Sequence, residues 1–486
     1  MRFIRRVKQP HPGSPRQAQP LVSARPRRSK SPKAHAPGPL PEQPTLPPEP
    51  ARFLRMERQV VADFRSQMLG ELGRRVDTET EQLRREPPIC PKEGCGRTMH
   101  RRGSTSTTQL TLCGLLTIRA DTFRCEPCKT RVRPLFDRLG IEPGRISGGL
   151  ARLMALLGVV VPYELAAQLV WILLGFEVNA MAVWREVQRL GAAYEAHDQA
   201  LCRYHNDART PSPEPAAPPD VVLLEPDGAA LGMQRKKRRK RTGPEAETAR
   251  AATPQPSEFR EVKTGVLMLP AERIETSPGR RSVLRRVVVT CLGDADTLFA
   301  RLWSAMCELG WRSEKTIVVI VGDGAEWIWN RASMFPRRCE ILDFWHAVER
   351  AWEFARLHFG TDSKAMADWA HALAVDLRAG KVVDVITQLR GLHCGQKEAR
   401  ELLDKLISYY TANASRMQYD QYLRLGYGIG SGAVESAHKQ VLQARLRQAG
   451  MRWSVRGAQH LLALRVLLLN GRWSDLDRLG RPSLAA

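Results

Sequence analysis

Three aspartates each follow a short apolar segment: Asp227, Asp323 and Asp343. If those segments are parallel strands, their carboxyl ends meet at one edge of a sheet, where ligands tend to bind. Carboxylate oxygens are the ligands that Mg²⁺ and Mn²⁺ prefer, and two such ions about 3.5–4 Å apart activate a water or a 3′-hydroxyl to attack a phosphodiester. The alternative for the two Asp-Gly pairs is a turn at a strand end. Because the arrangement recurs, we favour a site for two divalent ions.

Glu435 is the acid that we expect to complete this metal site with Asp227 and Asp323. It follows the glycine-rich segment 426–432 and begins a helical stretch. Glycine at every second position lets the backbone bend closely past a ligand. Residues 428–433 also fit the dinucleotide-binding pattern G-x-G-x-x-A, but no strand precedes them, so we exclude that interpretation.

Four cysteines are spaced as two pairs: Cys90, Cys95, Cys125 and Cys128. Between the pairs, 105–112 and 116–123 alternate in polarity like two strands, with Gly114 at the turn. Cysteine pairs at the ends of a hairpin place four thiolates around one structural Zn²⁺ ion, whereas the alternative is unrelated reduced thiols. We expect Cys113 to be buried rather than a ligand. Ten cysteines in 486 residues exclude a disulfide scaffold and favour a reducing cytoplasm.

The elements that position these residues begin with helices. Residues 162–173 and 179–194 are two predicted helices joined by a short break, and the helix lengths and the short connection are typical of a helix-turn-helix. The second helix then offers Arg185, Gln188 and Arg189 to a DNA groove. The alternative is an ordinary pair of packed helices, which gives the same pattern.

Two further segments carry basic residues suited to a phosphate backbone. Near the C-terminus Arg445 and Arg452 lie among leucines, with Trp453 as an aromatic anchor. The alternative there is a core helix with a solvated basic face. The run 235–241 is entirely Lys and Arg and is either a phosphate contact or a solvated loop. Its proposed DNA contacts are Arg235, Lys236, Lys237 and Arg238.

After residue 220 the pattern alternates between strands and helices. The expected strands are 221–224, 259–269, 284–292, 316–321 and 339–342, with a helix over 294–309. Three strands, a helix, a strand, a helix and a strand is the order of an RNase H-like α/β fold.

Several motifs resemble bacterial insertion-sequence transposases of the ISKra group. They are Gly322–Asn330, Phe335-Pro336, Ile341–Ala347, Gly426–Glu435, Gly450–Ser454 and Leu469–Trp473. The resemblance covers 87–475 and is most specific over 322–360 and 426–473. It implies a DDE enzyme that binds terminal inverted repeats of double-stranded DNA and uses divalent metal to cut and join it, acting as a dimer or larger assembly.

The resemblance also assigns roles to single residues. Asp227, Asp323 and Glu435 correspond to the three acids. Asp343-x-x-His346 resembles the D/C-x-x-H element of Mutator-like transposases, in which His346 would hold a phosphate or relay a proton; the alternative is a satisfied core histidine. This sequence departs from the family in having Pro226 before the first acid and an insertion over 229–258.

Together these patterns predict a multidomain α+β protein: an RNase H-like catalytic domain with an all-α insertion, preceded by a zinc-ribbon-like hairpin and a helix-turn-helix-like domain. The expected divisions are a disordered basic tail (1–50), a helical segment (51–86), a zinc ribbon (87–136), the helix-turn-helix-like domain (140–205), a linker (206–219), the catalytic domain (220–360 and 426–475) interrupted by helices (361–425), and a tail (476–486).

The charge balance points to a polyanionic partner. Lys and Arg number 75 against 51 acidic residues, which gives a formal net charge of +24. The planar guanidinium group of arginine binds phosphate oxygens through two parallel hydrogen bonds. A basic ribosomal protein or a coding bias gives a similar count. The longest apolar run is too short to span a membrane, and no secretory signal is visible. We expect a bacterial cytoplasmic, nucleoid-associated transposase; the rivals are a non-catalytic DNA-binding protein, domesticated or inactivated, and a nuclease without strand transfer.

Overall fold

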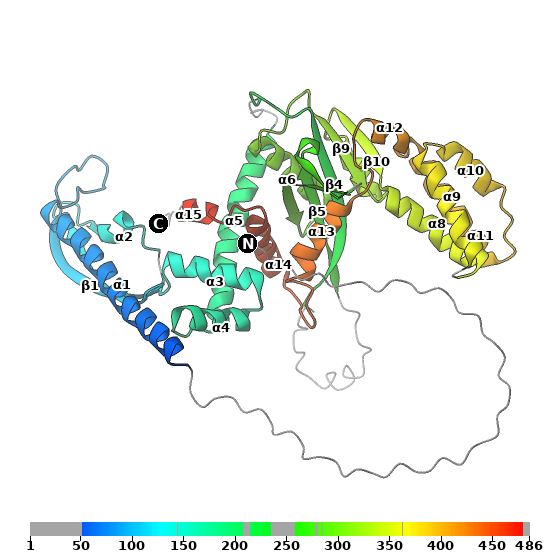
Figure 1. Ribbon diagram of the computed structural model, residues 1–486. Coiled ribbons are helices and arrows are strands. Elements are labelled where there is room, and N and C mark those ends of the chain that lie inside the picture. The colour runs from blue at the N-terminus through cyan, green and yellow to red at the C-terminus, as the bar shows by residue number, and fades with distance from the viewer. Residues whose placement is uncertain are drawn as a thin grey trace, which may run out of the picture. The chain divides into compact units, whose positions relative to one another are not determined.

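A computed structural model describes residues 51–142, 144–207, 214–234, 258–277, 280–283, 285–361 and 363–479 (Figure 1). The chain divides into two compact units, residues 1–59 and 60–486. The described part of the first unit is the beginning of one helix, and the remaining described elements belong to the second unit. The expected tail 1–50 and the basic run 235–241 lie outside the described residues, as do 480–486 of the expected C-terminal tail.

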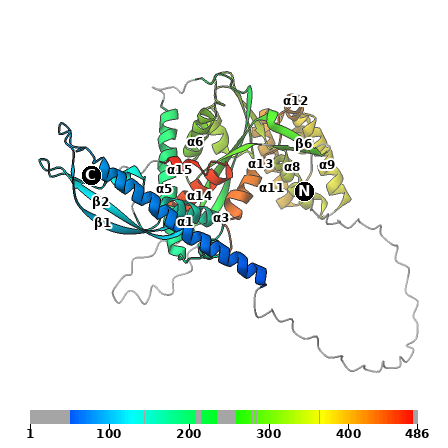
Figure 2. The same cartoon turned by 60° about the vertical axis from the view of Figure 1, so that its left-hand side comes forward.

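The four cysteines lie at the base of a β-hairpin that packs against a helix. The helix lies across the hairpin (Figure 2), and Val76 and Leu83 from its second half share a core with Leu116 and Ile118 of the hairpin. The two strands predicted over 105–112 and 116–123 are present as an antiparallel hairpin, whose turn directly precedes Gly114. The elements are α1 (Arg52–Arg85), β1 (His100–Thr111), β2 (Gly114–Arg124), β3 (Arg131–Val132) and α2 (Pro134–Arg138).

Three helices follow, and the predicted pair is among them. They are α3 (Gly148–Val160), α4 (Tyr163–Leu174) and α5 (Ala180–His205). The Asn179 side chain caps α5 by accepting a hydrogen bond from the backbone N–H of Ala182 at 2.8 Å, as its position predicts. Gly175 ends α4 with a φ of 75°, a left-handed conformation that favours glycine. The helix α5 continues well beyond Tyr194, where the sequence pattern placed its end.

A five-stranded mixed sheet follows these helices. Its strands are β4 (Val221–Gly232), β5 (Phe259–Met268), β8 (Arg286–Cys291), β9 (Ile317–Gly322) and β10 (Arg338–Leu342). Their order is β10-β9-β4-β5-β8, in which β4, β9 and β10 run parallel and β5 is antiparallel to β4 and β8. A separate hairpin that the sequence pattern did not predict, β6 (Arg273–Ser277) and β7 (Arg280–Val283), precedes β8.

Helices cover both faces of the sheet (Figure 1). Val222 and Leu224 pack in one core with α6 (Ala295–Glu308) and α7 (Glu326–Ala332), while Leu223 belongs to the core on the opposite face. The second face is covered by α8 (Phe344–Phe359), α13 (Gly432–His438) and α14 (Val455–Leu469). Coverage of both faces explains why these strands are continuously apolar rather than alternating.

The span between α8 and α13 is helical, as expected for 361–425. It contains α9 (Lys364–Arg378), α10 (Val382–Arg390), α11 (Lys397–Asn413) and α12 (Tyr419–Arg424). The sequence pattern predicted a long helix from Glu435 onward. This prediction is wrong, because α13 passes at Lys439 into a short π-helical turn before α14 begins. The last element is α15 (Asp475–Arg478). No helix in the described part of the chain is long and apolar enough to cross a membrane. The protein is thus a mixed α+β protein with a helical majority.

Candidate acidic site and cysteine cluster

Asp227 and Asp323 occupy matching positions on two neighbouring parallel strands. The parallel pairing of β4 with β9 ends where Leu224 pairs with Ile320, and each aspartate lies three residues further along its own strand direction. Asp227 was expected after the end of its strand, but β4 continues to Gly232 because its second half pairs with β5. Asp227 nevertheless lies beyond the end of the parallel ladder, toward the carboxyl end of β9.

Asp343 extends this row onto the third parallel strand. Leu342 pairs with Gly322, so Asp343 and Asp323 follow a paired position directly. The Asp343 carboxylate is 1% exposed and accepts hydrogen bonds from the backbone N–H groups of Trp345 and His346, which cap α8. Its other oxygen accepts from both the N–H and the hydroxyl of Ser431. Asp343 therefore holds the glycine-rich segment to the sheet edge, and little of its carboxylate remains free for chemistry.

Glu435 is brought to the same edge by the helix α13. The buried side chain of Glu225, on β4, accepts hydrogen bonds from the backbone N–H groups of Ala433 and Val434 at 2.8 and 3.0 Å. A carboxylate at this position satisfies N–H groups that have no partner within the helix. Sequence reasoning missed Glu225, whose position among apolar strand residues was the available signal.

His438 was also missed, and it links α13 to Asp227. Its Nδ1 atom lies 3.2 Å from Oδ2 of Asp227, and the residue is 7% exposed. His438 is three residues after Glu435, a spacing that places both side chains on one helix face. That spacing was visible in the sequence, but the partner was not.

An open hollow of about 520 Å³ lies beside Glu435. Its lining residues are Trp345, His346, Val348, Glu349, Trp352, Arg356 and Glu435. His346 Nδ1 is 3.5 Å from Asp343 Oδ2, the outer limit for a hydrogen bond. The contact with Asp343, opposed by partial burial and helped by the charges of Asp323 and Glu349, raises the pKa of His346 to about 9. His346 is thus a cation at neutral pH that faces the same hollow as Glu435.

The loop that carries Asp323 is held by the helix α11. Asp323 Oδ1 accepts a hydrogen bond from the backbone N–H of Ala325 at 3.0 Å, and its backbone carbonyl accepts one from the Tyr409 hydroxyl at 2.7 Å. Gly324 has a φ of 95°, and a Cβ atom there would lie 2.8 Å from the Tyr409 ring. The helical span between α8 and α13 therefore takes part in shaping the acidic edge.

The cysteines form a compact cluster, as predicted. The Sγ atoms of Cys90, Cys95, Cys125 and Cys128 all lie within 4.8 Å of one another. Four thiolates around Zn²⁺ at about 2.3 Å stand about 3.8 Å apart, and the Cys95–Cys125 separation is 3.7 Å. A hydrogen bond from the backbone N–H of Arg97, aided by the neighbouring thiols, lowers the pKa of Cys95 to about 7. This cluster could bind a structural zinc ion, and Cys113 lies outside it.

The acids at the sheet edge are more widely spaced than the cysteines. Among the described residues, the cysteine cluster alone brings three or more Cys, His, Asp or Glu ligand atoms within 4.8 Å of one another. Asp227, Asp323 and Glu435 thus share an edge without meeting at ligand distances. Their carboxylate oxygens are nevertheless the donor set that fits hard divalent cations.

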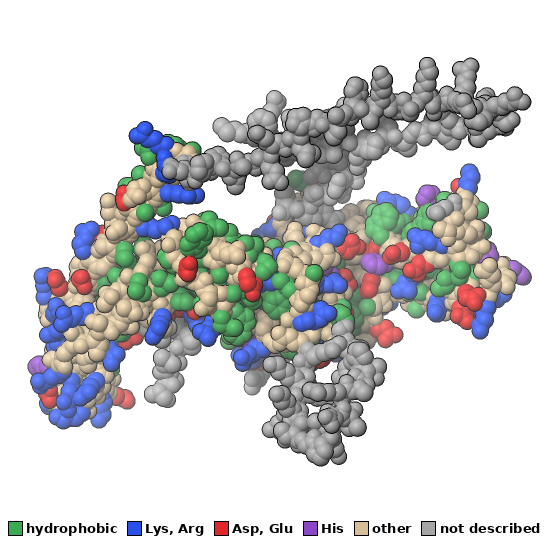
Figure 3. Space-filling model, turned by 90° about the horizontal axis from the view of Figure 1, so that it is seen from below, with side chains coloured by type: hydrophobic (Ala, Val, Ile, Leu, Met, Phe, Trp, Pro, Cys, Tyr) green, Lys and Arg blue, Asp and Glu red, His purple; other side chains and the backbone are tan. Residues whose placement is uncertain are grey.

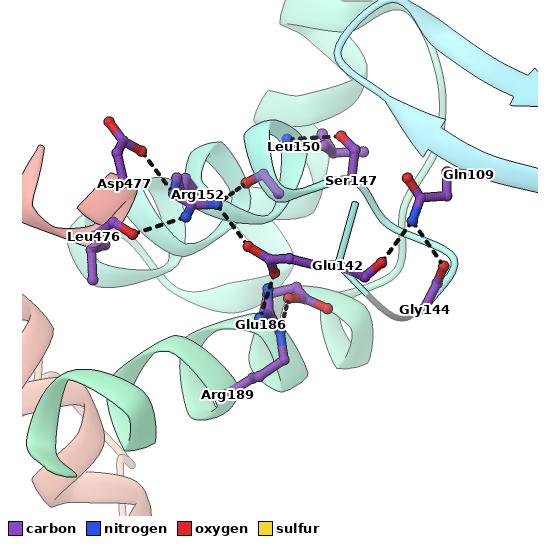
Figure 4. A network of polar contacts seen from close by, with 11 residues as sticks. Gln109, Glu142, Gly144, Ser147, Leu150, Arg152, Glu186, Arg189, Leu476 and Asp477 are labelled. Carbon is purple, nitrogen blue, oxygen red and sulfur yellow. Dashed lines mark hydrogen bonds and ion pairs between the residues drawn. The ribbon is translucent and has the colours of Figure 1, made fainter. Parts of the chain in front are cut away.

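Two of the three residues proposed to read DNA on α5 already have partners within the protein, although Gln188 is only partly buried and Arg189 is exposed. The side-chain oxygen of Gln188 lies 3.0 Å from His460 Nδ1 on α14, within hydrogen-bond distance. Arg189 makes ion pairs with Glu142 and Glu186 at 2.7 and 2.8 Å, part of the polar network in Figure 4. Arg185 is exposed. Gln188 is partly covered because α5 packs against α14, a long-range contact that local periodicity does not reveal.

The surface over α4 is apolar rather than basic. Trp171, Ile172 and Leu173 are each more than half exposed. Figure 3, viewed from the side of α4, shows hydrophobic side chains gathered in this region with few charged ones. Of the two cations predicted on α5 to contact DNA, both Arg185 and Arg189 are exposed, and Arg189 is ion-paired to Glu142 and Glu186.

The prediction that Arg445 contacts DNA is wrong for this structure. Arg445 is completely buried, donates to the Gly158 carbonyl at 3.0 Å and lies over the rings of Tyr163 and Trp453. Trp453 is also buried, and its indole N–H donates to the Leu446 carbonyl. The arginine thus lies at the C-terminal end of α3, where a cation is favoured.

Arg452, in contrast, is exposed at the surface. The backbone N–H of Gln234 donates to the Trp453 carbonyl at 2.8 Å, next to Arg452. Gln234 directly precedes the basic run 235–241, which lies outside the described residues. Arg452 and the point where the chain enters the basic run are therefore neighbours.

No model of a known protein family matches this chain, and no curated protein gives a significant sequence match.

Proposed function

We propose that the protein is a DDE-type DNA transposase of a bacterial insertion sequence, similar to the ISKra group. The observation that carries the proposal is the row of acids at the ends of the parallel strands: Asp227 and Asp323 each lie three residues beyond the last pair of the β4–β9 ladder, and Glu435 lies on a helix tied to β4. If each Asp-Gly pair served only to form a turn, there would be no reason for the two aspartates to lie at matching positions or for Glu435 to lie on a helix beside them.

The strand arrangement supports an RNase H-like catalytic domain. The first three strands of the sheet, β4, β5 and β8, form an antiparallel meander, and the next two, β9 and β10, join on the other side of β4 and run parallel to it. Strands, helices and strands thus follow the order expected for that fold. The helices α9 to α12 interrupt the domain before the last acid.

In this proposal Asp227, Asp323 and Glu435 hold two Mg²⁺ or Mn²⁺ ions. When bound, such ions activate the attacking oxygen and stabilise the leaving oxygen of a phosphodiester. The protein's own residues orient these ligands: Tyr409 holds the loop that carries Asp323, and Asp343 holds the segment that leads into α13 and Glu435. The cationic His346, facing the same hollow, is placed to hold a phosphate oxygen. No covalent protein–DNA intermediate is required.

The DNA duplex in this proposal is held electrostatically at exposed basic groups. Arg452, Arg185 and the ion-paired Arg189 are the exposed candidates that remain after the burial of Arg445, and the basic run 235–241, outside the described residues, is a further candidate from the sequence. The cysteine cluster would hold a structural Zn²⁺ ion. The enzyme is expected to act as a homodimer or larger assembly on paired transposon ends.

The test is a cleavage and strand-transfer assay with the inverted repeats of the element that encodes the protein, in Mg²⁺ or Mn²⁺. We expect cleavage by the wild type and at least a 100-fold loss in Asp323→Asn and Glu435→Gln. The matched controls Asp404→Asn and Glu398→Gln, both on the exposed surface of α11, should retain wild-type activity. Salt-sensitive binding to the ends without metal-dependent cleavage would instead support a non-catalytic DNA-binding protein. Equal activity of all variants would refute the acid assignment.

A further inference from the structure

We propose that His438 is a positioning residue, which holds the Asp227 carboxylate in the orientation needed to bind a divalent cation. The proposal rests on the proposed function of the acidic edge and deepens it. No residue among the expected acids or the D-x-x-H element has this role.

The contact is direct, with His438 buried and the Asp227 side chain 30% exposed. Nδ1 of His438 lies 3.2 Å from Oδ2 of Asp227, while Oδ1 of Asp227 accepts a hydrogen bond from the Gly228 N–H at 2.7 Å. An imidazole that donates from Nδ1 fixes one carboxylate oxygen, and the backbone fixes the other. Interactions of this kind orient metal-binding carboxylates in many sites.

Two buried polar atoms with no hydrogen-bond partner within the described residues point to the same place. They are Nε2 of His438 and Oγ1 of Thr264. Thr264 is completely buried and pairs with Asp227 across the antiparallel β4–β5 ladder, so both side chains project from the same face of the sheet. Buried polar groups normally have partners, and unsatisfied ones tend to mark positions that bind water or ions or take part in function. Asp227 is thus flanked by Thr264 from the sheet and His438 from the helix.

The same helix carries Glu435, so His438 also ties the two acids together. At its start α13 is fixed to β4 by the hydrogen bonds to Glu225, and at its end by the contact of His438 with Asp227. Arg286, on β8, adds a hydrogen bond to the Ser436 hydroxyl at 3.0 Å. Glu435 lies between these fixed points. A shift of His438 would therefore disturb the first and third acids at once.

The experiment measures Mn²⁺ binding to the full-length, zinc-loaded chain by the loss of the free-ion electron paramagnetic resonance signal. His438→Asn keeps an N–H donor near the position of Nδ1, whereas His438→Leu keeps apolar volume and removes the donor. We expect His438→Leu to weaken Mn²⁺ binding about 10-fold or more, and His438→Asn to retain most of the affinity. Thr264→Val, close in shape, tests the neighbouring hydroxyl and should weaken binding less than His438→Leu.

The outcomes separate the inference from the proposed function. Asp227→Asn defines the Mn²⁺ binding that depends on the acidic edge, and thermal unfolding of each variant confirms that it is folded. If the wild type and Asp227→Asn bind equally, the proposed function fails. If binding depends on Asp227 but His438→Leu binds as tightly as the wild type, only the positioning role is overturned. Equal weakening in the Leu and Asn variants would also overturn it, because His438 would then act through shape alone.

Discussion

Asp343 and Ser431, 88 positions apart, are joined by two hydrogen bonds, in which the backbone N–H and the hydroxyl of Ser431 both donate to Oδ2 of Asp343. The pair closes the glycine-rich segment over the end of β10. Burial opposes ionisation of Asp343, but hydrogen bonds from His346 and Ser431 outweigh it and keep its pKa below the ordinary value.

We predict that Asp343→Asn destabilises the protein by about 2–4 kcal/mol, since it weakens a helix cap and a charge-assisted contact together. Ser431→Ala removes only the hydroxyl and should cost about 1–2 kcal/mol. Urea unfolding followed by circular dichroism measures both. A loss of cleavage in Asp343→Asn with unchanged stability would contradict the structural role and point to direct participation in catalysis.

The raised pKa of His346 predicts a pH-dependent stabilisation. The contribution should be complete below pH 6.5, where the histidine is protonated in both folded and unfolded states, and should disappear as the pH rises through about 9. The difference in unfolding free energy between wild type and His346→Gln should therefore shrink between pH 6.5 and 9. Imidazole NMR titration supplies the second measurement. A His346 resonance that titrates near 6.5 would show that Asp343 does not hold the charge.

The cysteine cluster predicts one zinc ion per chain. The double variant Cys125→Ser, Cys128→Ser should contain about one fewer zinc than the wild type and should unfold at a lower temperature, because structural zinc contributes directly to folding. Cys113→Ser is the matched control, since that thiol lies outside the cluster. Metal analysis by mass spectrometry gives the count. An unchanged zinc content in the double variant would rule out the cluster as the ligand set.

Substitutions of Arg445 and of Arg452 should affect different properties: fold stability in the first case and DNA binding in the second. Arg445→Met leaves the Gly158 carbonyl without its donor and should destabilise the fold by about 1–3 kcal/mol, with no change in the salt dependence of DNA binding. Arg452→Ala should leave stability unchanged, weaken binding to all DNA sequences and lower the salt slope by about 1. Binding titrations at several salt concentrations distinguish the two. A lower slope in Arg445→Met would return that residue to the DNA interface.

The sequence pattern predicted the order of elements in the sheet well but not the length of its first strand. The apolar run Val221–Leu224 was visible because helices cover both faces there. Beyond it, β4 pairs only with β5, and residues such as Pro226 and Gly228 carry no strand pattern. Their extended conformation depends on pairing with β5, a segment whose register no local rule supplies.

The candidate site was predicted only in part, for a similar reason. Asp227, Asp323 and Glu435 follow local signals, whereas Glu225 and His438 act through partners more than 200 positions away. Arg445 shows the opposite error. Its charge suggested a surface position, but the Gly158 carbonyl near the end of α3 and two aromatic rings make burial favourable. Hydrophobic periodicity does not indicate which charged side chains will be buried and find partners inside the fold.

The contact between Glu225 and α13 spans 208 positions of the chain, and it has a consequence during synthesis. At about 5–20 residues per second, a ribosome needs roughly 10–40 s after making β4 before it has made α13. Throughout that interval the carboxylate of Glu225 has no helix to cap, and Asp227 has no imidazole beside it. A nascent chain can therefore fold its cysteine hairpin and first helices long before its acidic edge exists.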